Sequence, residues 1–135
     1  METALQGVAD FFERYTAAWN AVLSGEAPVT DLLAHFGFPC RFIATDGESV
    51  VFSDRERLGA FYAQRIRWLR ARGGAGLRHG RVTAEALPNA LVLADLRWDV
   101  RDREGSPALA WRHFYTLRPA AQGYRILISS FHTEE

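Results

Sequence analysis

The sequence predicts one α+β domain in which a curved antiparallel sheet wraps around an apolar pocket lined by helices. Two segments, residues 3–23 and 54–72, carry apolar residues at intervals of three and four, which is typical of amphipathic helices. From residue 77 onward, strand-like runs alternate with turn signals, as in an antiparallel meander. The 135 residues suffice for one domain and leave no room for a second.

Composition and charge exclude several classes of protein. The formal net charge is zero and the pI is about 6.9, so no overall field favours nucleic acid or an anionic membrane. Charges interrupt every hydrophobic segment before it reaches the roughly 20 residues that span a bilayer. The N-terminus lacks the pattern of a secretory signal, and Cys40 is the single cysteine, so we expect a cytoplasmic protein without disulfides.

Two helices are expected at the N-terminus. The first runs from Thr3 to about Leu23, where Ser24-Gly25 stops it. The second is short, spans residues 28–36 and ends at Gly37 and Pro39. The apolar stripe of the first helix comprises Leu5, Val8, Phe12, Tyr15, Trp19 and Val22.

A β-hairpin and a third helix follow. Residues 40–45 and 49–52 are β-rich runs on either side of Asp46-Gly47, a dipeptide suited to a tight hairpin turn. Ser53 is the expected N-cap of the third helix because Glu56 follows three residues later, as in a capping box. This helix ends at Gly73-Gly74. Its inner stripe comprises Leu58, Phe61, Tyr62, Ile66 and Leu69.

Four antiparallel strands complete the chain, at residues 77–87, 90–102, 108–118 and 124–132. Successive strand side chains point to opposite faces, so alternation identifies the buried face. By this parity His113 falls among apolar positions of the third of these strands. The inward set of the first strand is small, which would leave a cavity opposite large aromatic residues: Gly80, Val82, Ala84 and Ala86.

Three stretches of sequence resemble a known superfamily. They are FFERYTAAWNAV (residues 11–22), SDRERLGAFYAQ (residues 53–64) and HFYTLRPAAQGYRILISSFH (residues 113–132). With the order of elements, they resemble the nuclear transport factor 2 superfamily, which includes ketosteroid isomerase, scytalone dehydratase and the SnoaL-like polyketide cyclases. The resemblance covers nearly the whole chain and implies a cone-shaped α+β barrel with a pocket. It does not imply one reaction, because one fold hosts many functions.

The match to ketosteroid isomerase is partial. Tyr15 falls where that family places its oxyanion-hole tyrosine. The family's general-base aspartate would fall near residues 44–45, where only Asp46 is close, and its protonated aspartate would fall near residues 113–114. Steroid isomerisation is therefore not carried over to this chain.

Tyr15 and His113 are the candidate catalytic residues. A tyrosine hydroxyl can donate a hydrogen bond to a carbonyl or a developing oxyanion, and a histidine can act as general acid or base near neutral pH. Each also has a structural interpretation, in which the side chain packs in the core and finds a partner inside the protein. Asp46 is a weaker catalytic alternative because the Asp-Gly turn already accounts for it.

The expected pocket wall consists of large apolar groups and one arginine. Arg65, at the edge of the third helix's stripe, could hold a carboxylate or phosphate at the pocket mouth, or merely extend along apolar surface. Residues 65–81 carry six arginines and no acid, which either serves helix ends or attracts a phosphate-rich partner. The expected wall residues are Trp19, Phe42, Tyr62, Arg65, Ile66, Trp98, Trp111 and Phe131.

No cofactor or metal is expected, because the histidines and Cys40 show no paired ligand spacing and no phosphate loop is present. The first hypothesis is a small-molecule pocket protein of this superfamily. In its catalytic form it would be a cofactor-independent isomerase, dehydratase or cyclase acting on an apolar carbonyl compound. The alternative is a non-catalytic homodimeric module that binds a ligand or a protein. Membrane and nucleic-acid partners are not expected. The homodimer would form over the outer sheet face, which carries Asp95, Arg97, Asp99, Arg101 and Arg112.

Overall fold

The computed structural model describes the backbone of residues 2–132 and the side chains of residues 6–132, so the side chain of Leu5 lies outside it. No helix in this part of the chain is long and apolar enough to cross a membrane. The elements in chain order are α1 (Glu2–Leu23), α2 (Thr30–Leu33), β1 (Phe36–Ile43), β2 (Ser49–Phe52), α3 (Arg55–Ala71), β3 (Gly76–His79), β4 (Thr83–Ala86), the 3-10 turn η1 (Pro88–Ala90), β5 (Val92–Arg101), β6 (Pro107–Ala120) and β7 (Gly123–His132).

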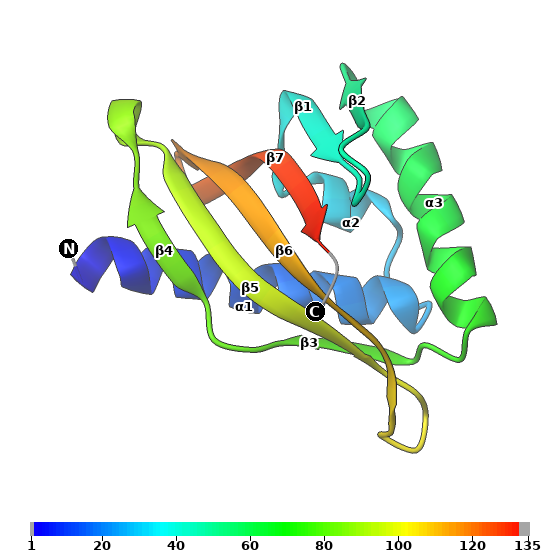
Figure 1. Cartoon of the computed structure of the whole chain (residues 1–135). Coiled ribbons are helices and arrows are strands. Elements are labelled where there is room, and N and C mark those ends of the chain that lie inside the picture. Colours follow the sequence, from blue (N-terminus) through cyan, green and yellow to red (C-terminus); the bar gives the residue numbers. More distant parts are fainter. Residues whose placement is uncertain (1, 133–135) are drawn as a thin grey trace.

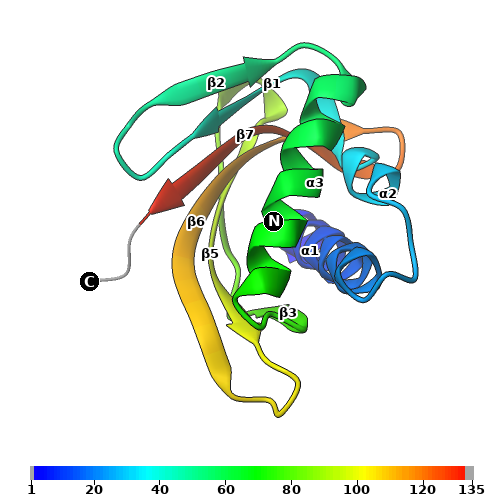
Figure 2. The same ribbon diagram turned by 90° about the vertical axis from the view of Figure 1, so that its right-hand side faces the viewer.

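The strands form one mixed sheet, in the order β2-β1-β7-β6-β5-β3, with β4 also paired to β5. Neighbouring strands are antiparallel except β1 and β7, which run parallel. The predicted hairpin and antiparallel meander are both present. The layout differs in detail, because β7 pairs with β1 and joins the two parts into one seven-stranded sheet, and the first strand of the meander is divided into β3 and β4. The sheet curves strongly, and the helices lie on its concave side (Figures 1 and 2).

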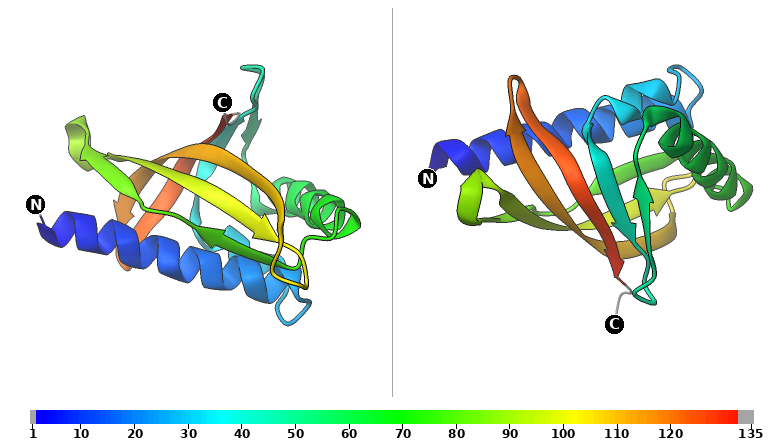
Figure 3. Two further views of the ribbon diagram at one scale, coloured as in Figure 1. Left: turned by 60° about the horizontal axis from the view of Figure 1, so that its bottom comes forward. Right: turned by 90° about the horizontal axis from the view of Figure 1, so that it is seen from above.

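Helix α1 is fixed against the sheet by its apolar stripe and by one amide. The predicted stripe is confirmed from Val8 to Val22, whose members are all buried. Asn20 accepts a hydrogen bond from the backbone N–H of Leu77 at 2.7 Å and donates one to the Leu77 carbonyl at 2.9 Å. The helix therefore runs beside β3, as Figure 3 shows. It ends at Leu23, as predicted, and Gly25 follows with a φ of +87°, the left-handed conformation that favours glycine.

The second helix is shorter than predicted. It ends at Leu33, and Phe36 begins β1 instead of extending the helix. The cause is sheet pairing, since the His35 carbonyl accepts a hydrogen bond from the Ile126 N–H at 2.8 Å. Gly37 lies inside β1, where a side chain would meet Arg118 and Leu127 at about 3 Å.

The third helix begins one residue later than predicted. Asp54, and not Ser53, is the N-cap, because its side chain accepts a hydrogen bond from the Arg57 N–H at 2.9 Å. Serine and aspartate are both favourable N-cap residues, so the residue types alone do not decide which of the two caps the helix. The predicted end is confirmed: Gly73 has a φ of +83°, and the Gly74 N–H donates to the Leu69 carbonyl at 2.9 Å.

The strand predicted over residues 77–87 is broken in two. His79 pairs with Trp98 and Thr83 pairs with Asp95, so the intervening residues 80–82 lie opposite residues 96–97. One extra residue reverses the parity of the side chains. Leu77 therefore faces inward in β3, while Ala84 packs on the core from β4. The predicted inward set of small residues is wrong for Gly80 and Ala86, both of which are exposed.

The outer face of the sheet carries charge pairs within the chain. Arg112 donates two hydrogen bonds, of 3.1 and 2.7 Å, to the carboxylate of Asp95. Asp99 accepts from Arg101 at 2.7 Å and from Arg78 at 3.3 Å. The inward face of β5 is as predicted, with all five apolar members buried: Val92, Ala94, Leu96, Trp98 and Val100.

Candidate functional site

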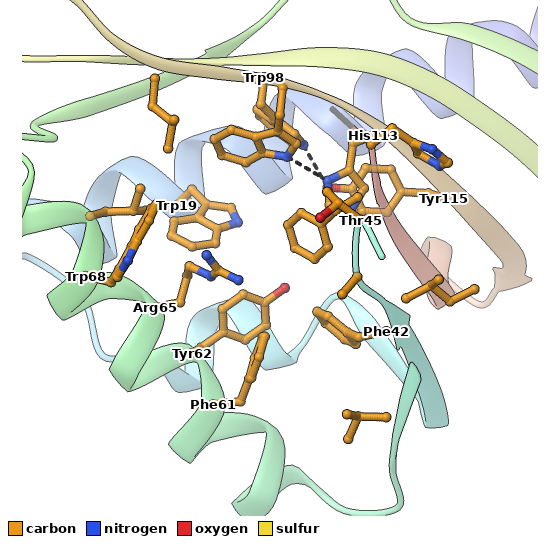
Figure 4. Close-up of a pocket in the computed structure, with 18 of the residues that line it drawn as sticks. Trp19, Phe42, Thr45, Phe61, Tyr62, Arg65, Trp68, Trp98, His113 and Tyr115 are labelled. Carbon is orange, nitrogen blue, oxygen red and sulfur yellow. Dashed lines mark hydrogen bonds between the residues drawn. The ribbon is translucent and has the colours of Figure 1, made fainter. Parts of the chain in front are cut away.

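A cavity of about 400 Å³ lies between the concave face of the sheet and the helices α1 and α3. This volume is within the range of small-molecule sites. Its inner end is fully buried at Tyr15 and Trp98, whereas Thr45, Glu48 and His132 at its other end are exposed. The cavity therefore runs from a closed interior to a mouth formed by the β1–β2 turn and the end of β7. Figure 4 shows the side chains that surround it.

Most of the side chains expected from the sequence converge on this cavity. Tyr15 and His113, from α1 and β6, both line it. Ile66 is buried but lies outside the lining. Helix α3 turns the opposite edge of its apolar stripe toward the cavity, the edge that carries Phe61 and Trp68. The other expected wall residues that line it are Trp19, Phe42, Tyr62, Arg65, Trp98, Trp111 and Phe131.

Three buried tyrosines form the polar end of the cavity. The hydroxyls of Tyr15 and Tyr62 lie 3.2 Å apart and share a hydrogen bond. The Tyr115 hydroxyl accepts a hydrogen bond from the indole N–H of Trp98 at 2.8 Å. Three hydroxyl hydrogens are thus present, and the Tyr15–Tyr62 bond uses one of them. Within residues 6–132, no side chain or carbonyl accepts the other two.

The tyrosines are donors rather than bases at neutral pH. Burial raises the pKa of Tyr15 to about 12, and hydrogen bonding to Tyr62 and Trp19 only partly offsets this. Burial also raises the pKa of Tyr62 well above its usual value, and the neighbouring Tyr15 and Tyr115 raise it further. Such hydroxyls keep their protons and can donate hydrogen bonds to a ligand oxygen.

His113 is buried with both ring nitrogens engaged. The Trp111 indole N–H donates to Nδ1 at 2.9 Å, and Nε2 lies 2.7 Å from the Ser129 hydroxyl. The ring stacks on Tyr115 with its centroid 4.3 Å away. Burial lowers the pKa of His113 well below its usual value, and His132 and Arg65 lower it further. The ring is therefore neutral and held by the protein.

Arg65 supplies the one guanidinium among the lining residues that the structure describes. Its Cζ lies 5.8 Å from the ring centre of Phe61, 5.2 Å from Trp68 and 5.4 Å from Phe131. These are distances of cation–π contacts. In the described part of the chain it makes no ion pair and no hydrogen bond. Burial lowers its pKa, opposed by the nearby Tyr62, and Figure 4 shows the group directed into the cavity.

Asp46 does not line the cavity. It lies in the turn between β1 and β2, where its Oδ1 accepts a hydrogen bond from the Glu48 N–H at 3.0 Å. Gly47 follows with a φ of +89°. The turn thus accounts for the Asp-Gly dipeptide.

The arginine-rich segment 65–81 does not act as one patch. Arg70 donates to the last carbonyls of α1, those of Val22 and Leu23, at 3.0 and 3.1 Å. Arg78 pairs with Asp99, and Arg65 is the one arginine of this segment that lines the cavity. The interpretation that these arginines stabilise helix ends therefore holds for Arg70, although Arg70 binds the C-terminal end of α1 and not that of its own helix.

Several lining residues were not identified from the sequence. Tyr115 shares the parity of His113, and Phe61 and Trp68 flank Arg65 at helical spacing, so these were within reach of pattern reasoning. Glu48 and His132 carried no signal, because their place at the mouth depends on how β7 pairs with β1. No group of three His, Cys, Asp or Glu side chains that could hold a metal ion occurs among residues 6–132.

Comparison with known proteins identifies the fold and the family. No curated protein matches the sequence. Aln2 from a Streptomyces species has a similar structure, with a TM-score of 0.74 at 15% identity over 98% of this chain and 92% of that one. An NTF-2 like protein of unknown function from Shewanella oneidensis MR-1 has a TM-score of 0.70 at 13% identity, covering 98% and 99%.

A third similar structure is the beta subunit of a putative aromatic-ring-hydroxylating dioxygenase from Novosphingobium aromaticivorans DSM 12444. Its TM-score is 0.62 at 17% identity, with 99% of this chain and 92% of that one covered. At such identities the likeness shows the fold alone. Residues 4–134 match the family described as NTF2-like protein (DUF6841). The chain therefore belongs to this NTF2-like family, which confirms the superfamily resemblance of its sequence.

Proposed function

We propose that the protein binds a small ring-bearing molecule in the cavity and holds an oxygen acceptor of that molecule with tyrosine hydroxyls. One observation carries the proposal: two hydroxyl hydrogens of the Tyr15, Tyr62 and Tyr115 cluster have no acceptor among residues 6–132, and they lie at the closed end of an aromatic cavity. A buried donor without an acceptor is unfavourable, so a bound carbonyl or hydroxyl oxygen would stabilise this arrangement.

The aromatic wall defines the rest of the ligand. All four tryptophans of the chain line the cavity, together with Phe42, Phe61 and Phe131. Aromatic side chains favour offset or edge-to-face contacts with flat rings. A ligand with one or two fused rings and a carbonyl group fits both this wall and the tyrosine end.

The test is calorimetric titration with 2-acetylnaphthalene, a neutral two-ring ketone. We expect saturable binding at one site. Leu109→Trp should weaken it at least tenfold, because Leu109 lines the cavity and the larger side chain would occupy it. Ala108→Trp is the matched control, since Ala108 is exposed on the same strand and lies outside this cavity. The proposal fails if the ketone does not bind, or if a folded Leu109→Trp variant binds it equally well.

A cofactor-independent isomerase, dehydratase or cyclase is the second candidate, favoured by the hydrogen-bonded hydroxyls of Tyr15 and Tyr62. Such a pair could stabilise a developing enolate, and loss of one oxyanion donor typically lowers the rate about 10²–10³-fold. The engaged nitrogens of His113 instead favour binding without proton transfer. Deuterium exchange at the methyl group of bound 2-acetylnaphthalene distinguishes the two. We expect no acceleration over buffer, whereas acceleration that Tyr15→Phe removes would establish catalysis.

A further inference from the structure

We propose that Arg65 recognises a carboxylate, and hence that the ligand class is a flat aromatic carboxylic acid whose ring system stacks in the cavity. This inference rests on the proposed ligand-binding function and adds the charge and orientation of the ligand. It arises from a juxtaposition that the binding of a neutral ketone does not explain: a half-buried guanidinium surrounded by aromatic rings and lacking a counter-ion in residues 6–132.

The position of Arg65 is unusual for a structural arginine. An arginine that only covers apolar surface extends its charged head to water, and one that stabilises the fold pairs with a carboxylate or carbonyl. Arg70, on the same helix, does the latter through Val22 and Leu23. Arg65 does neither, since its head lies among Phe61, Trp68 and Phe131 and is directed into the cavity.

A partly buried charge is unfavourable unless an opposite charge accompanies it. Glu48 is the one acidic residue among the described cavity-lining side chains, and it lies exposed at the mouth without an ion pair to Arg65. The ring centres of Phe61, Trp68 and Phe131 lie within 5.8 Å of the guanidinium, and the rings offer flat surfaces to an aromatic ligand. A ligand anion that enters the cavity would supply the missing counter-charge.

The charge balance favours a carboxylate over a phosphate. Arg65 contributes the single guanidinium of the described lining, and the neighbouring His113 is neutral. One guanidinium matches one carboxylate through two parallel N–H···O bonds, whereas a phosphate group would bring a second charge and further oxygens. The adjoining rings would stack on Trp68 and Phe131, and a second oxygen could reach the tyrosines.

The experiment compares two probes of nearly the same shape, the anionic naphthalene-2-carboxylate and the neutral naphthalene-2-carboxamide, by calorimetry at pH 7.5. For the wild-type protein we expect the carboxylate to bind at least tenfold more tightly. Arg65→Met should remove this preference, because it weakens the binding of the carboxylate at least tenfold more than that of the carboxamide. Arg67→Met is the control, because Arg67 is exposed on the same helix and lies outside the lining.

The outcomes separate the inference from the proposed function. If neither naphthalene compound nor the ketone binds, the ligand-binding proposal itself fails and the inference fails with it. If the carboxamide or ketone binds but the carboxylate binds no better, or if the preference survives in Arg65→Met, the inference alone is wrong. Arg65→Gln provides a second variant should Arg65→Met fold poorly, and the same loss of preference is expected from it.

Discussion

The indole N–H of Trp111 donates a hydrogen bond to Nδ1 of His113 over 2.9 Å. Nδ1 is therefore the acceptor nitrogen, and the proton of the neutral ring lies on Nε2, which donates to the Ser129 hydroxyl at 2.7 Å. Protonation of Nδ1 would place two N–H donors against each other. The imidazole thus joins β6 to β7 and offers no free nitrogen to a ligand.

His113→Gln should therefore destabilise the fold more than it affects binding. Glutamine cannot reproduce both bonds of the ring, and an unsatisfied buried polar group costs about 1–3 kcal/mol. We expect a loss of this size in the free energy of unfolding, measured with urea at pH 7.5, while the affinity of the folded variant for 2-acetylnaphthalene changes little. Unchanged stability with lost binding would instead assign His113 to the ligand.

The same histidine should make stability depend on pH. Because its folded-state pKa lies below the unfolded value, the unfolded chain takes up a proton first as the pH falls. Stability is therefore complete above about pH 6.5 and decreases below it, by at most about 1.4 kcal/mol per pH unit for this one group. Burial also lowers the pKa of His35. His35 therefore adds to the pH dependence of stability in the wild type and in His113→Gln alike.

The comparison isolates His113. Urea unfolding between pH 7.5 and 5 should show that the free energy of unfolding falls less steeply with decreasing pH for His113→Gln than for the wild type. Equal slopes would contradict the assignment of a neutral buried imidazole.

Tyr62→Phe should weaken the binding of 2-acetylnaphthalene. Figure 4 shows the Tyr62 side chain extending from α3 toward the cavity, and its hydroxyl belongs to the pair that can donate to a ligand oxygen. A net hydrogen bond is worth about 0.5–1.5 kcal/mol, so a decrease in affinity of about two- to tenfold is expected. Tyr124→Phe, which alters a half-buried ring outside the lining, should leave the affinity unchanged. Equal affinities of all three proteins would remove Tyr62 from the site.

Asp54→Ala should destabilise the protein by about 1 kcal/mol, whereas Ser53→Ala should have little effect. The reason is the bond from the Arg57 N–H to the Asp54 carboxylate at 2.9 Å, which satisfies one free donor at the start of α3. Thermal unfolding of the two variants measures the difference. The reverse order would show that Ser53 is the cap in solution.

A homodimer over the outer sheet face stays a prediction. The charges that suggested it, Asp95 with Arg112 and Asp99 with Arg101, already pair within the chain, so an interface would have to rely on other contacts. Phe114 is half-buried on this outer face, with Arg112 over its ring, and offers an apolar surface for such a contact. Sedimentation at micromolar concentration should give twice the 15.2 kDa of one chain, and Phe114→Asp should lower it. A mass of 15.2 kDa at every concentration would refute the dimer.

Pattern reasoning predicted the parts of the fold that depend on local spacing. The stripe of α1, the ends of α1 and α3 and the inward face of β5 all follow from the positions of apolar residues and glycines. It failed where one residue of register decides the outcome. A single extra residue between His79 and Thr83 reversed the parity of that strand, and pairing of the His35 carbonyl with Ile126 ended α2 before Phe36.

For the candidate site, too, the sequence predicted some features and not others. Helix and strand parity placed Tyr15 and His113 on inward faces and Arg65 at the edge of an apolar stripe, and the structure brings all three around one cavity. Hydrogen-bond partners could not be predicted, because they join segments distant in sequence, such as Trp98 with Tyr115. That Arg65 has no counter-ion among residues 6–132 likewise depends on contacts between distant segments, which local spacing does not predict.

The account depends most on where the ligand binds, and the tryptophans report this directly. All four line the cavity, so all four indole N–H resonances belong to its wall. In a nitrogen–proton NMR titration with naphthalene-2-carboxylate, we expect the indole resonances of Trp19, Trp68, Trp98 and Trp111 to shift in step with calorimetric saturation. The backbone amides of Gly105 and Gln122, which lie in turns away from the lining residues, should stay unchanged. Saturable binding that moves the amides of these turns and leaves the indoles in place would contradict the account.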